Sequence, residues 1–372
     1  MSDHGGNIYA ASRATGIPEE EILDFSASIN PMGVPRKAAD ALKAAIDRLC
    51  HYPEPYSESL SEHLGQLFGV GAESIICGNG SAELIYLLPR ALKPACVLIP
   101  EPTFSEYERA CRIAGTSKKL RYRLKRENDF DVSPEAFAEK IIEACASSGK
   151  VHGRAGGSTG AGAMAFLCNP NNPTGRLVAR NDVLAIAETA RQQGCYLVVD
   201  EAFLDFCPGE SVLAEVKGNP YLIVVRSMTK FYALSGLRIG YAMMHPSVAV
   251  QVKPYKEPWT VNALAQKAAI EVTKDLSFQK ASLAAMAEEK SFMEGELHRL
   301  RIEFVPSRVN YYLLRLDRAL EVKTALQERG ILVRDCSNFV GLGPGFLRIA
   351  VRSRRENEIL IAEMGRICAP LS

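Results

Sequence analysis

The chain has no long apolar run and no excess of charge of either sign. None of its hydrophobic stretches approaches the roughly 20 residues that are needed to span a bilayer. Its 44 lysines and arginines nearly balance its 43 aspartates and glutamates, so the formal net charge is +1. Such a surface has no general attraction for nucleic acid or for an anionic membrane, and we expect neither as a partner. Any anion that the protein binds must therefore be held by local arginines.

Disulfide and metal-binding patterns are also missing. The ten cysteines are scattered and form no Cys-x-x-Cys pair, and the chain opens without a signal peptide. These features predict reduced thiols in a cytoplasmic protein rather than a disulfide or zinc framework. No spacing of histidine, cysteine and carboxylate residues is typical of a metal site, so we expect no metal.

What the chain does have is the length and patterning of an α/β enzyme. Its 372 residues, 47% of them hydrophobic, are enough to bury a large core and to divide into two lobes. Helix and strand patterns alternate, which predicts a mainly parallel central sheet with helices on both faces. Helices are expected over residues 35–49 and 57–68, and another should start at Ser133-Pro134. Buried strands are expected over residues 96–99, 163–168, 196–199 and 222–225.

Residues 147–162 are rich in glycine and resemble a phosphate-binding loop at first sight. They have neither the lysine-serine ending of a Walker loop nor a Gly-x-Gly-x-x-Gly between a strand and a helix. We therefore interpret them as a flexible surface insertion.

Five polar residues occur in an informative order: Asn172, Asp200, Ser227, Lys230 and Arg238. A Ser-x-x-Lys pair alone is a weak signal, because lysines are usually solvated surface charges. The whole set offers an amide, an acid, a hydroxyl, an amine and a guanidinium. Pyridoxal phosphate needs these groups at its phenolic oxygen, its ring nitrogen, its phosphate and its point of covalent attachment.

Two segments ahead of this set strengthen the interpretation. Gly80, Ser81 and Ala82 follow a short strand and open a helix. Glycine lets the backbone approach an anion, and amides at a helix N-terminus bind phosphate, although a plain strand-to-helix turn is the alternative. Phe104 follows another strand and is placed to stack on the pyridine ring, unless it is simply a core residue.

With these motifs the chain resembles the fold type I pyridoxal-phosphate enzymes of the class I and II aminotransferase superfamily over nearly its full length. The resemblance implies that Lys230 holds the cofactor covalently, that Asp200 pairs with the ring nitrogen and that Asn172 bonds the phenolic oxygen. It also implies a homodimer with shared active sites and three parts: an N-terminal segment (1–35) that closes over the site, a large cofactor-binding domain (36–257) and a small α/β lobe (258–372). The implied phosphate ligands are Gly80, Ser81, Ala82, Ser227, Arg238 and, from the neighbouring subunit, Tyr52.

Four narrower motifs resemble the threonine-phosphate decarboxylases of cobalamin biosynthesis. They are His4-Gly-Gly-Asn7, the segment from Asp24 to Gly33, Pro258-Trp-Thr-Val-Asn262 and the segment from Arg334 to Phe339. Histidinol-phosphate aminotransferase is the nearest alternative, and both resemblances imply a small amino substrate that carries a phosphate. The implied substrate-binding residues are His4, Gly5, Ser28, Asn172, Arg334 for the phosphate and Arg348 for the α-carboxylate.

Two positions depart from the usual patterns. Phe203 stands where the superfamily often has a tyrosine, which removes a hydroxyl from the phenolic oxygen and agrees better with the decarboxylases. Ser28 stands where the decarboxylases commonly have asparagine, so O-phospho-L-serine is an alternative to O-phospho-L-threonine as the substrate. We therefore expect decarboxylation of phosphothreonine to aminopropanol phosphate. A pyridoxal-phosphate-binding regulator without catalysis is the alternative of a different class.

Overall fold

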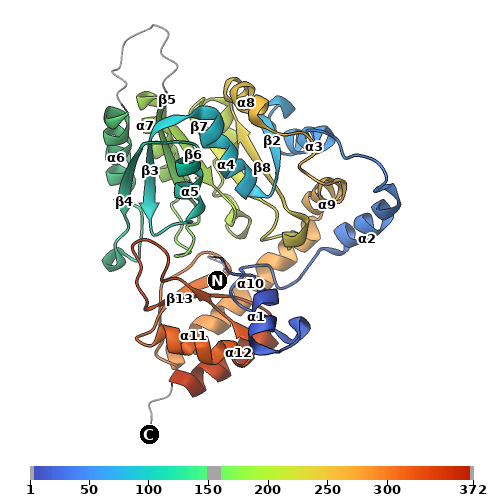
Figure 1. The fold of residues 1–372 in the computed structure, drawn as a ribbon, viewed down its shortest axis with the longest axis vertical. Coiled ribbons are helices and arrows are strands. Elements are labelled where there is room, and N and C mark those ends of the chain that lie inside the picture. Colours follow the sequence, from blue (N-terminus) through green and yellow to red (C-terminus); the bar gives the residue numbers. More distant parts are fainter. Residues whose placement is uncertain (1–3, 149–160, 369–372) are drawn as a thin grey trace.

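The computed structural model describes residues 4–148 and 161–368, whose strands form two larger sheets and one two-stranded sheet (Figure 1). The larger sheet has seven strands in the order β2-β8-β7-β6-β5-β3-β4, and only β8 runs antiparallel to its neighbours. This architecture confirms the predicted α/β fold with a mainly parallel central sheet. The strands are β2 (Ile75–Asn79), β3 (Pro94–Glu101), β4 (Lys118–Arg123), β5 (Ala161–Cys168), β6 (Tyr196–Asp200), β7 (Leu222–Ser227) and β8 (Ile239–Met244).

Helices cover both faces of this sheet because alternate strand residues point to opposite sides. In β3, Cys96 and Leu98 belong to one buried cluster, whereas Val97 and Ile99 belong to the other. Helices α4 (Ser81–Leu92), α5 (Glu106–Ile113) and α8 (Pro246–Val252) pack on the second face. The first face is covered by α3 (Glu58–Phe68), α6 (Pro134–Ser147), α7 (Arg180–Gln193) and α9 (Ala263–Thr273), and α2 (Arg36–Ala45) packs against α9.

The C-terminal part forms a smaller antiparallel sheet in the order β12-β13-β10-β9, shown in orange and red in Figure 1. Its strands are β9 (Glu303–Phe304), β10 (Tyr311–Arg315), β12 (Arg334–Asp335) and β13 (Phe346–Ala350), with helices α10 (Leu276–Arg299), α11 (Ala319–Gln327) and α12 (Arg354–Cys368). The N-terminus joins this part, because β1 (Leu23–Asp24) pairs with β11 (Ile331–Leu332). Helix α1 (Ile8–Thr15) precedes β1 and lies beside the same lobe.

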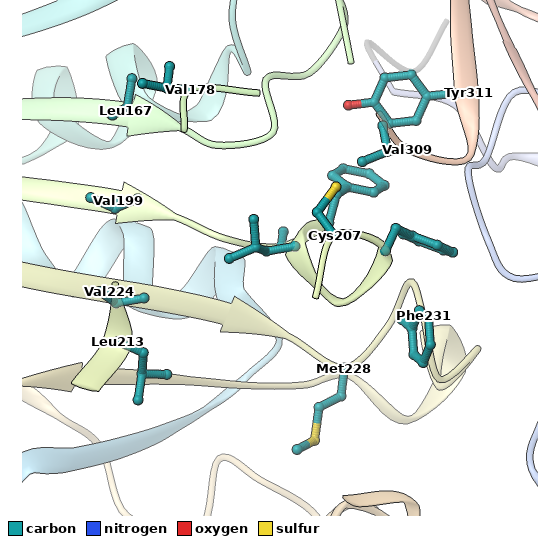
Figure 2. Close-up of a cluster of buried hydrophobic side chains, with 14 of the residues drawn as sticks. Leu167, Val178, Val199, Cys207, Leu213, Val224, Met228, Phe231, Val309 and Tyr311 are labelled. Carbon is teal, nitrogen blue, oxygen red and sulfur yellow. The ribbon is translucent and has the colours of Figure 1, made fainter. Parts of the chain in front are cut away.

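One hydrophobic core continues from the large sheet into the smaller one. Figure 2 shows Leu167, Val199 and Val224 on three neighbouring strands, with Val309 and Tyr311 beyond the strand ends. The carboxyl ends of the large sheet therefore meet the small sheet across packed side chains. The predicted limits of the lobes, after residues 35 and 257, remain predictions.

The individual elements predicted from periodicity are confirmed. The two early helices are α2, which a short 3₁₀ turn extends to Arg48, and α3. Helix α6 starts at Pro134, and the Ser133 hydroxyl caps it by accepting a hydrogen bond from the Ala136 amide at 3.3 Å. The four predicted strands are β3, β5, β6 and β7. Residues 149–160 of the glycine-rich segment lie outside the described residues, and no helix among the described ones could cross a membrane.

Candidate active site

A cavity of about 510 Å³ lies where β5, β6 and β7 end and the small sheet begins. Its size and its convergent polar groups are those of a small-molecule site. A cavity of about 610 Å³ between α3, β2 and α8 is larger but contains none of the predicted site residues. The predicted residues that line the smaller cavity are His4, Gly5, Ser28, Ser81, Ala82, Phe104, Asn172, Asp200, Ser227, Lys230, Arg238, Arg334 and Arg348.

Lys230 lies in the wall of this cavity, three residues after the end of β7. Burial, followed by the charges of Arg348 and Arg238, lowers the pKa of its amine to about 8, and only Asp200 and Asp24 oppose the shift. The unprotonated fraction of the amine near neutral pH is therefore far larger than that of an ordinary lysine. An uncharged lysine is a nucleophile and a proton acceptor, which a solvated surface lysine is not.

Asp200 ends β6 and is only 3% exposed. Burial raises the pKa of its carboxyl to about 6, while hydrogen bonds from the Tyr107 hydroxyl and the Ala202 amide act in the opposite direction. These two bonds, at 2.7 Å and 3.0 Å, each occupy a different carboxylate oxygen. The carboxylate is therefore held in one orientation and is ionised at neutral pH.

Tyr107 is a residue of this site that sequence reasoning missed. Its ring is fully buried and stacks on Phe166 with centroids 4.7 Å apart. The signal was present, because Tyr107 lies only three residues after Phe104, and the two rings contact edge to face with centroids 5.6 Å apart. Only the fold shows that this hydroxyl reaches Asp200.

The predicted phosphate cradle forms around the start of α4. Gly80 has a φ of 77°, and a Cβ there would collide with the Arg238 guanidinium. A Cβ on Gly240 would likewise collide with the Ser81 amide. The first amides of a helix have no intrahelical partner, so this close approach places donors beside the Arg238 guanidinium and the Ser227 hydroxyl. Gly80 supports the cradle although it does not line the cavity.

The two predicted substrate arginines lie side by side, because Arg334 on β12 is the register partner of Arg348 on β13. Arg348 donates to the Ser26 carbonyl at 2.9 Å and to the Asn172 side chain. Its Nε and the Ser28 hydroxyl are buried and have no hydrogen-bond partner among the described residues. Buried polar groups are normally satisfied, so these two residues of the cavity wall have hydrogen-bonding capacity left for a polar ligand.

Arg334 is oriented by the loop that follows it. Its Nη2 donates to the Asn338 side chain at 3.0 Å, and its guanidinium lies 5.4 Å from the centre of the Phe339 ring. These contacts hold the guanidinium at the cavity. Phe203 also lines the cavity, and the nearby Tyr311 hydroxyl donates to the Asn171 carbonyl at 2.8 Å, so it does not replace the hydroxyl that Phe203 lacks.

Tyr52 is the predicted residue that the structure does not bring to this cavity. Its side chain is 86% exposed and lies 5.7 Å, between ring centroids, from Trp259. Its role toward a neighbouring subunit therefore remains a prediction.

Comparison with known proteins adds a family and several relatives. The family model described as "Aminotransferase class I and II" matches residues 20–364. Over 370 residues the chain is 35% identical to a threonine-phosphate decarboxylase of Salmonella typhimurium, covering 98% of this chain and 96% of the relative. Over 319 residues it is 33% identical to a histidinol-phosphate aminotransferase of Caldanaerobacter subterraneus, covering 85% and 84%.

A solved structure supports the same comparison in three dimensions. The L-threonine-O-3-phosphate decarboxylase of Porphyromonas gingivalis superposes with a TM-score of 0.77 at 28% identity, covering 93% of this chain and 99% of that one.

Proposed function

We propose a function from the premise that this chain belongs to the aminotransferase class I and II family. The proposed function of the protein is that of a pyridoxal-phosphate-dependent decarboxylase, which converts O-phospho-L-threonine to (R)-1-aminopropan-2-yl phosphate for cobalamin biosynthesis. The observation that carries the proposal is the pairing of Arg334 with Arg348 at one cavity. Two adjacent guanidinium groups match a small substrate that has a carboxylate and a phosphate. The near full-length similarity to a threonine-phosphate decarboxylase supports the same choice.

The residues present fit pyridoxal phosphate. The glycine-dependent approach of α4 to Arg238 forms an anion cradle, and Asp200 and Lys230 lie in the same cavity. When bound, the cofactor supplies a protonated conjugated ring that accepts the electrons released when a bond at the substrate Cα breaks.

The residues of the chain have separate roles in this reaction. Lys230 would hold the cofactor through its amine, and its nitrogen would carry the proton that replaces the lost carboxylate at the substrate Cα. Asp200 keeps the ring nitrogen protonated, and Asn172 bonds the phenolic oxygen. Ser227, Arg238 and the first amides of α4 hold the cofactor phosphate.

Arg348 and Arg334 orient the substrate at its two ends. The unpaired Nε of Arg348 lets it bind the α-carboxylate through a guanidinium edge, while Arg334 binds the phosphate. His4, Gly5 and Ser28 complete the substrate side of the cavity. Because a transaminase would use the same cofactor ligands, this orientation decides which bond at Cα breaks.

The test of the function is to follow carbon dioxide and the amine product together, with O-phospho-L-threonine and no oxo-acid acceptor. Sustained release of both in equal amounts establishes decarboxylation, since transamination would stop after one turnover without an acceptor. Turnover of histidinol phosphate with 2-oxoglutarate, without loss of carbon dioxide from phosphothreonine, would replace the proposal by an aminotransferase. Faster release of carbon dioxide from O-phospho-L-serine would keep decarboxylation as the reaction but make phosphoserine the substrate. Cofactor binding without any turnover would favour a regulator.

Arg334→Ala is expected to reduce the preference for phosphothreonine over threonine by about 10- to 100-fold, the value of one charged hydrogen bond. Arg334→Lys should recover only part of the preference, because it restores the charge but not the planar fork. The measurement is kcat/KM for both substrates. Arg329→Ala is the matched control, since Arg329 pairs with Glu363 outside the cavity. Unchanged discrimination in Arg334→Ala would remove this residue from the phosphate site.

The proposed assembly is a homodimer in which Tyr52 reaches the cofactor phosphate of the neighbouring subunit. The exposed Tyr52 and Trp259 rings support this assembly, since a solvated aromatic pair is unusual unless a partner covers it. A reducing, cytoplasmic location fits the ten free thiols.

A further inference from the structure

The first described residues of the chain cross from one lobe to the other at the active-site cavity. Helix α1 lies on the small lobe, where Ala10 and Ala14 line a groove together with Lys323 and Gln327 of α11. His4, just before α1, reaches the other lobe instead. Its Nε2 lies 3.0 Å from a carboxylate oxygen of Glu106, which is 102 positions away on α5. Both residues line the active-site cavity.

The backbone of this crossing is closely packed against the substrate-binding loop. A Cβ on Gly5 would collide with the backbone carbonyl of Ser26, and the Gly6 amide donates to the Ser26 hydroxyl at 2.8 Å. The same Ser26 carbonyl accepts the hydrogen bond from Arg348. The crossing segment (residues 4–6) is therefore held next to the residue proposed to bind the α-carboxylate, and its first residue, His4, contacts Glu106.

Glu106 itself is fixed by the large lobe. Its side chain is 11% exposed, and its second carboxylate oxygen accepts a hydrogen bond from the Tyr86 hydroxyl on α4. Arg109, one turn further along α5, has its guanidinium 3.7 Å from that oxygen. With one oxygen engaged by α4 and α5, the other is directed at His4.

The charge of Glu106 excludes the simplest alternative role. A carboxylate repels a phosphate dianion, so Glu106 does not bind the phosphate of the proposed substrate. His4 and Arg334 do offer donors to a phosphate, and both line the same cavity as Glu106. Any favourable effect of Glu106 on the phosphate of this substrate is therefore indirect, through the cavity-lining side chains that it contacts, His4 and Arg109.

We propose that Glu106 is a positioning residue that holds His4 across the cavity and so sets the affinity for the phosphate end of the substrate. This inference rests on the proposed function for the identity of the substrate. In this proposal, the contact between His4 and Glu106 attaches the crossing segment to the large lobe.

The sign of the effect of Glu106→Ala on KM tests the proposal. If Glu106 positions His4, KM for phosphothreonine should rise at least about tenfold while kcat changes little, because a uniform binding interaction has been lost. If Glu106 acts only by its charge, KM should fall, since repulsion disappears and Arg109 is released. Glu106→Gln retains an acceptor oxygen for His4 and should lie between the wild type and Glu106→Ala. A KM that is unchanged or lower in Glu106→Ala overturns the proposal.

Glu108→Gln is the matched control, because Glu108 lies on the same helix and pairs with Lys119 rather than with His4. A double-mutant cycle with His4→Ala adds a second criterion. The combined variant should be no worse than either single variant if the two residues act as a unit. Additive losses would show that Glu106 and His4 act separately and would also overturn the proposal.

Hydrogen exchange separates this inference from the proposed function. Without substrate, the amides of residues 4–15 should exchange at least about tenfold faster in Glu106→Ala than in the wild type or in Glu108→Gln, because local opening is then easier. Equal exchange in all three proteins would overturn the proposal even if phosphothreonine is the substrate. Conversely, a wild type that does not decarboxylate phosphothreonine refutes the function, while the exchange measurement still tests the attachment.

Discussion

Replacing Lys230 by alanine is expected to lower kcat by at least about 10⁴-fold, since the variant loses both the covalent attachment and the proton transfer at Cα. Burial lowers the pKa of Lys230 to about 8, so the amine is available for both tasks near neutral pH. The measurement is carbon dioxide release from phosphothreonine. Borohydride should fix the cofactor to the wild-type peptide that contains Lys230, and this label should be lost in Lys230→Ala.

Lys290 provides the internal control for this experiment. Burial lowers the pKa of Lys290 to about 8 as well, but its amine donates to the Ser307 carbonyl at 2.8 Å and lies outside the cavity. A lowered lysine pKa alone would therefore label both residues, whereas placement at the cofactor site labels Lys230 only. A label on Lys290, or on any lysine other than Lys230, would contradict the assignment.

Asp200→Asn is expected to lower kcat by about 10²- to 10³-fold, the usual cost of removing a group that stabilises charge in the transition state. Asparagine has nearly the same shape but does not keep the ring nitrogen protonated. Tyr107→Phe should give a smaller loss, because it retains the carboxylate and removes only one of its two hydrogen bonds. Near-normal turnover of Asp200→Asn with a filled site would contradict the electronic role.

Asp200→Asn should lower turnover but should raise the stability of the cofactor-free protein. Burial raises the folded-state pKa of Asp200 to about 6, above its ordinary value near 3.8. Well below about pH 4 the group is protonated in both states and its burial as a charge costs no stability; the cost grows between about pH 4 and about pH 6 and is constant at higher pH. At about pH 8, Asp200→Asn should gain on the order of 2–3 kcal/mol in the free energy of unfolding.

Urea unfolding of the two cofactor-free proteins measures this gain. It should be present at about pH 8 and should be largely lost at about pH 3, where Asp200 is mostly protonated in both the folded and the unfolded chain. Cofactor must be absent, because binding to the folded state adds its own stabilisation. A less stable Asp200→Asn at about pH 8 would mean that the two hydrogen bonds outweigh the cost of burial.

Most of the residues proposed to hold the cofactor were predictable from the sequence because they lie at or near the end of a strand or the start of a helix. Asp200 closes β6 and Ser227 closes β7, while Ser81 opens α4. In a parallel sheet the carboxyl ends of successive strands meet at one edge, so local patterns place these side chains together. The apolar runs and helix starts that mark these elements are local as well.

Only the tertiary structure decided how the remaining groups are oriented, because their partners are far away along the chain. The Tyr107 hydroxyl reaches Asp200 across 93 positions, and Arg348 reaches the Ser26 carbonyl across 322. The pairing of Arg334 with Arg348 depends on the register of two antiparallel strands, which no local pattern specifies. The sequence by itself thus determined the residue types proposed to bind the cofactor, whereas long-range packing decided the hydrogen bonds of the Asp200 carboxylate, the placement of Arg334 beside Arg348 and the contact between His4 and Glu106.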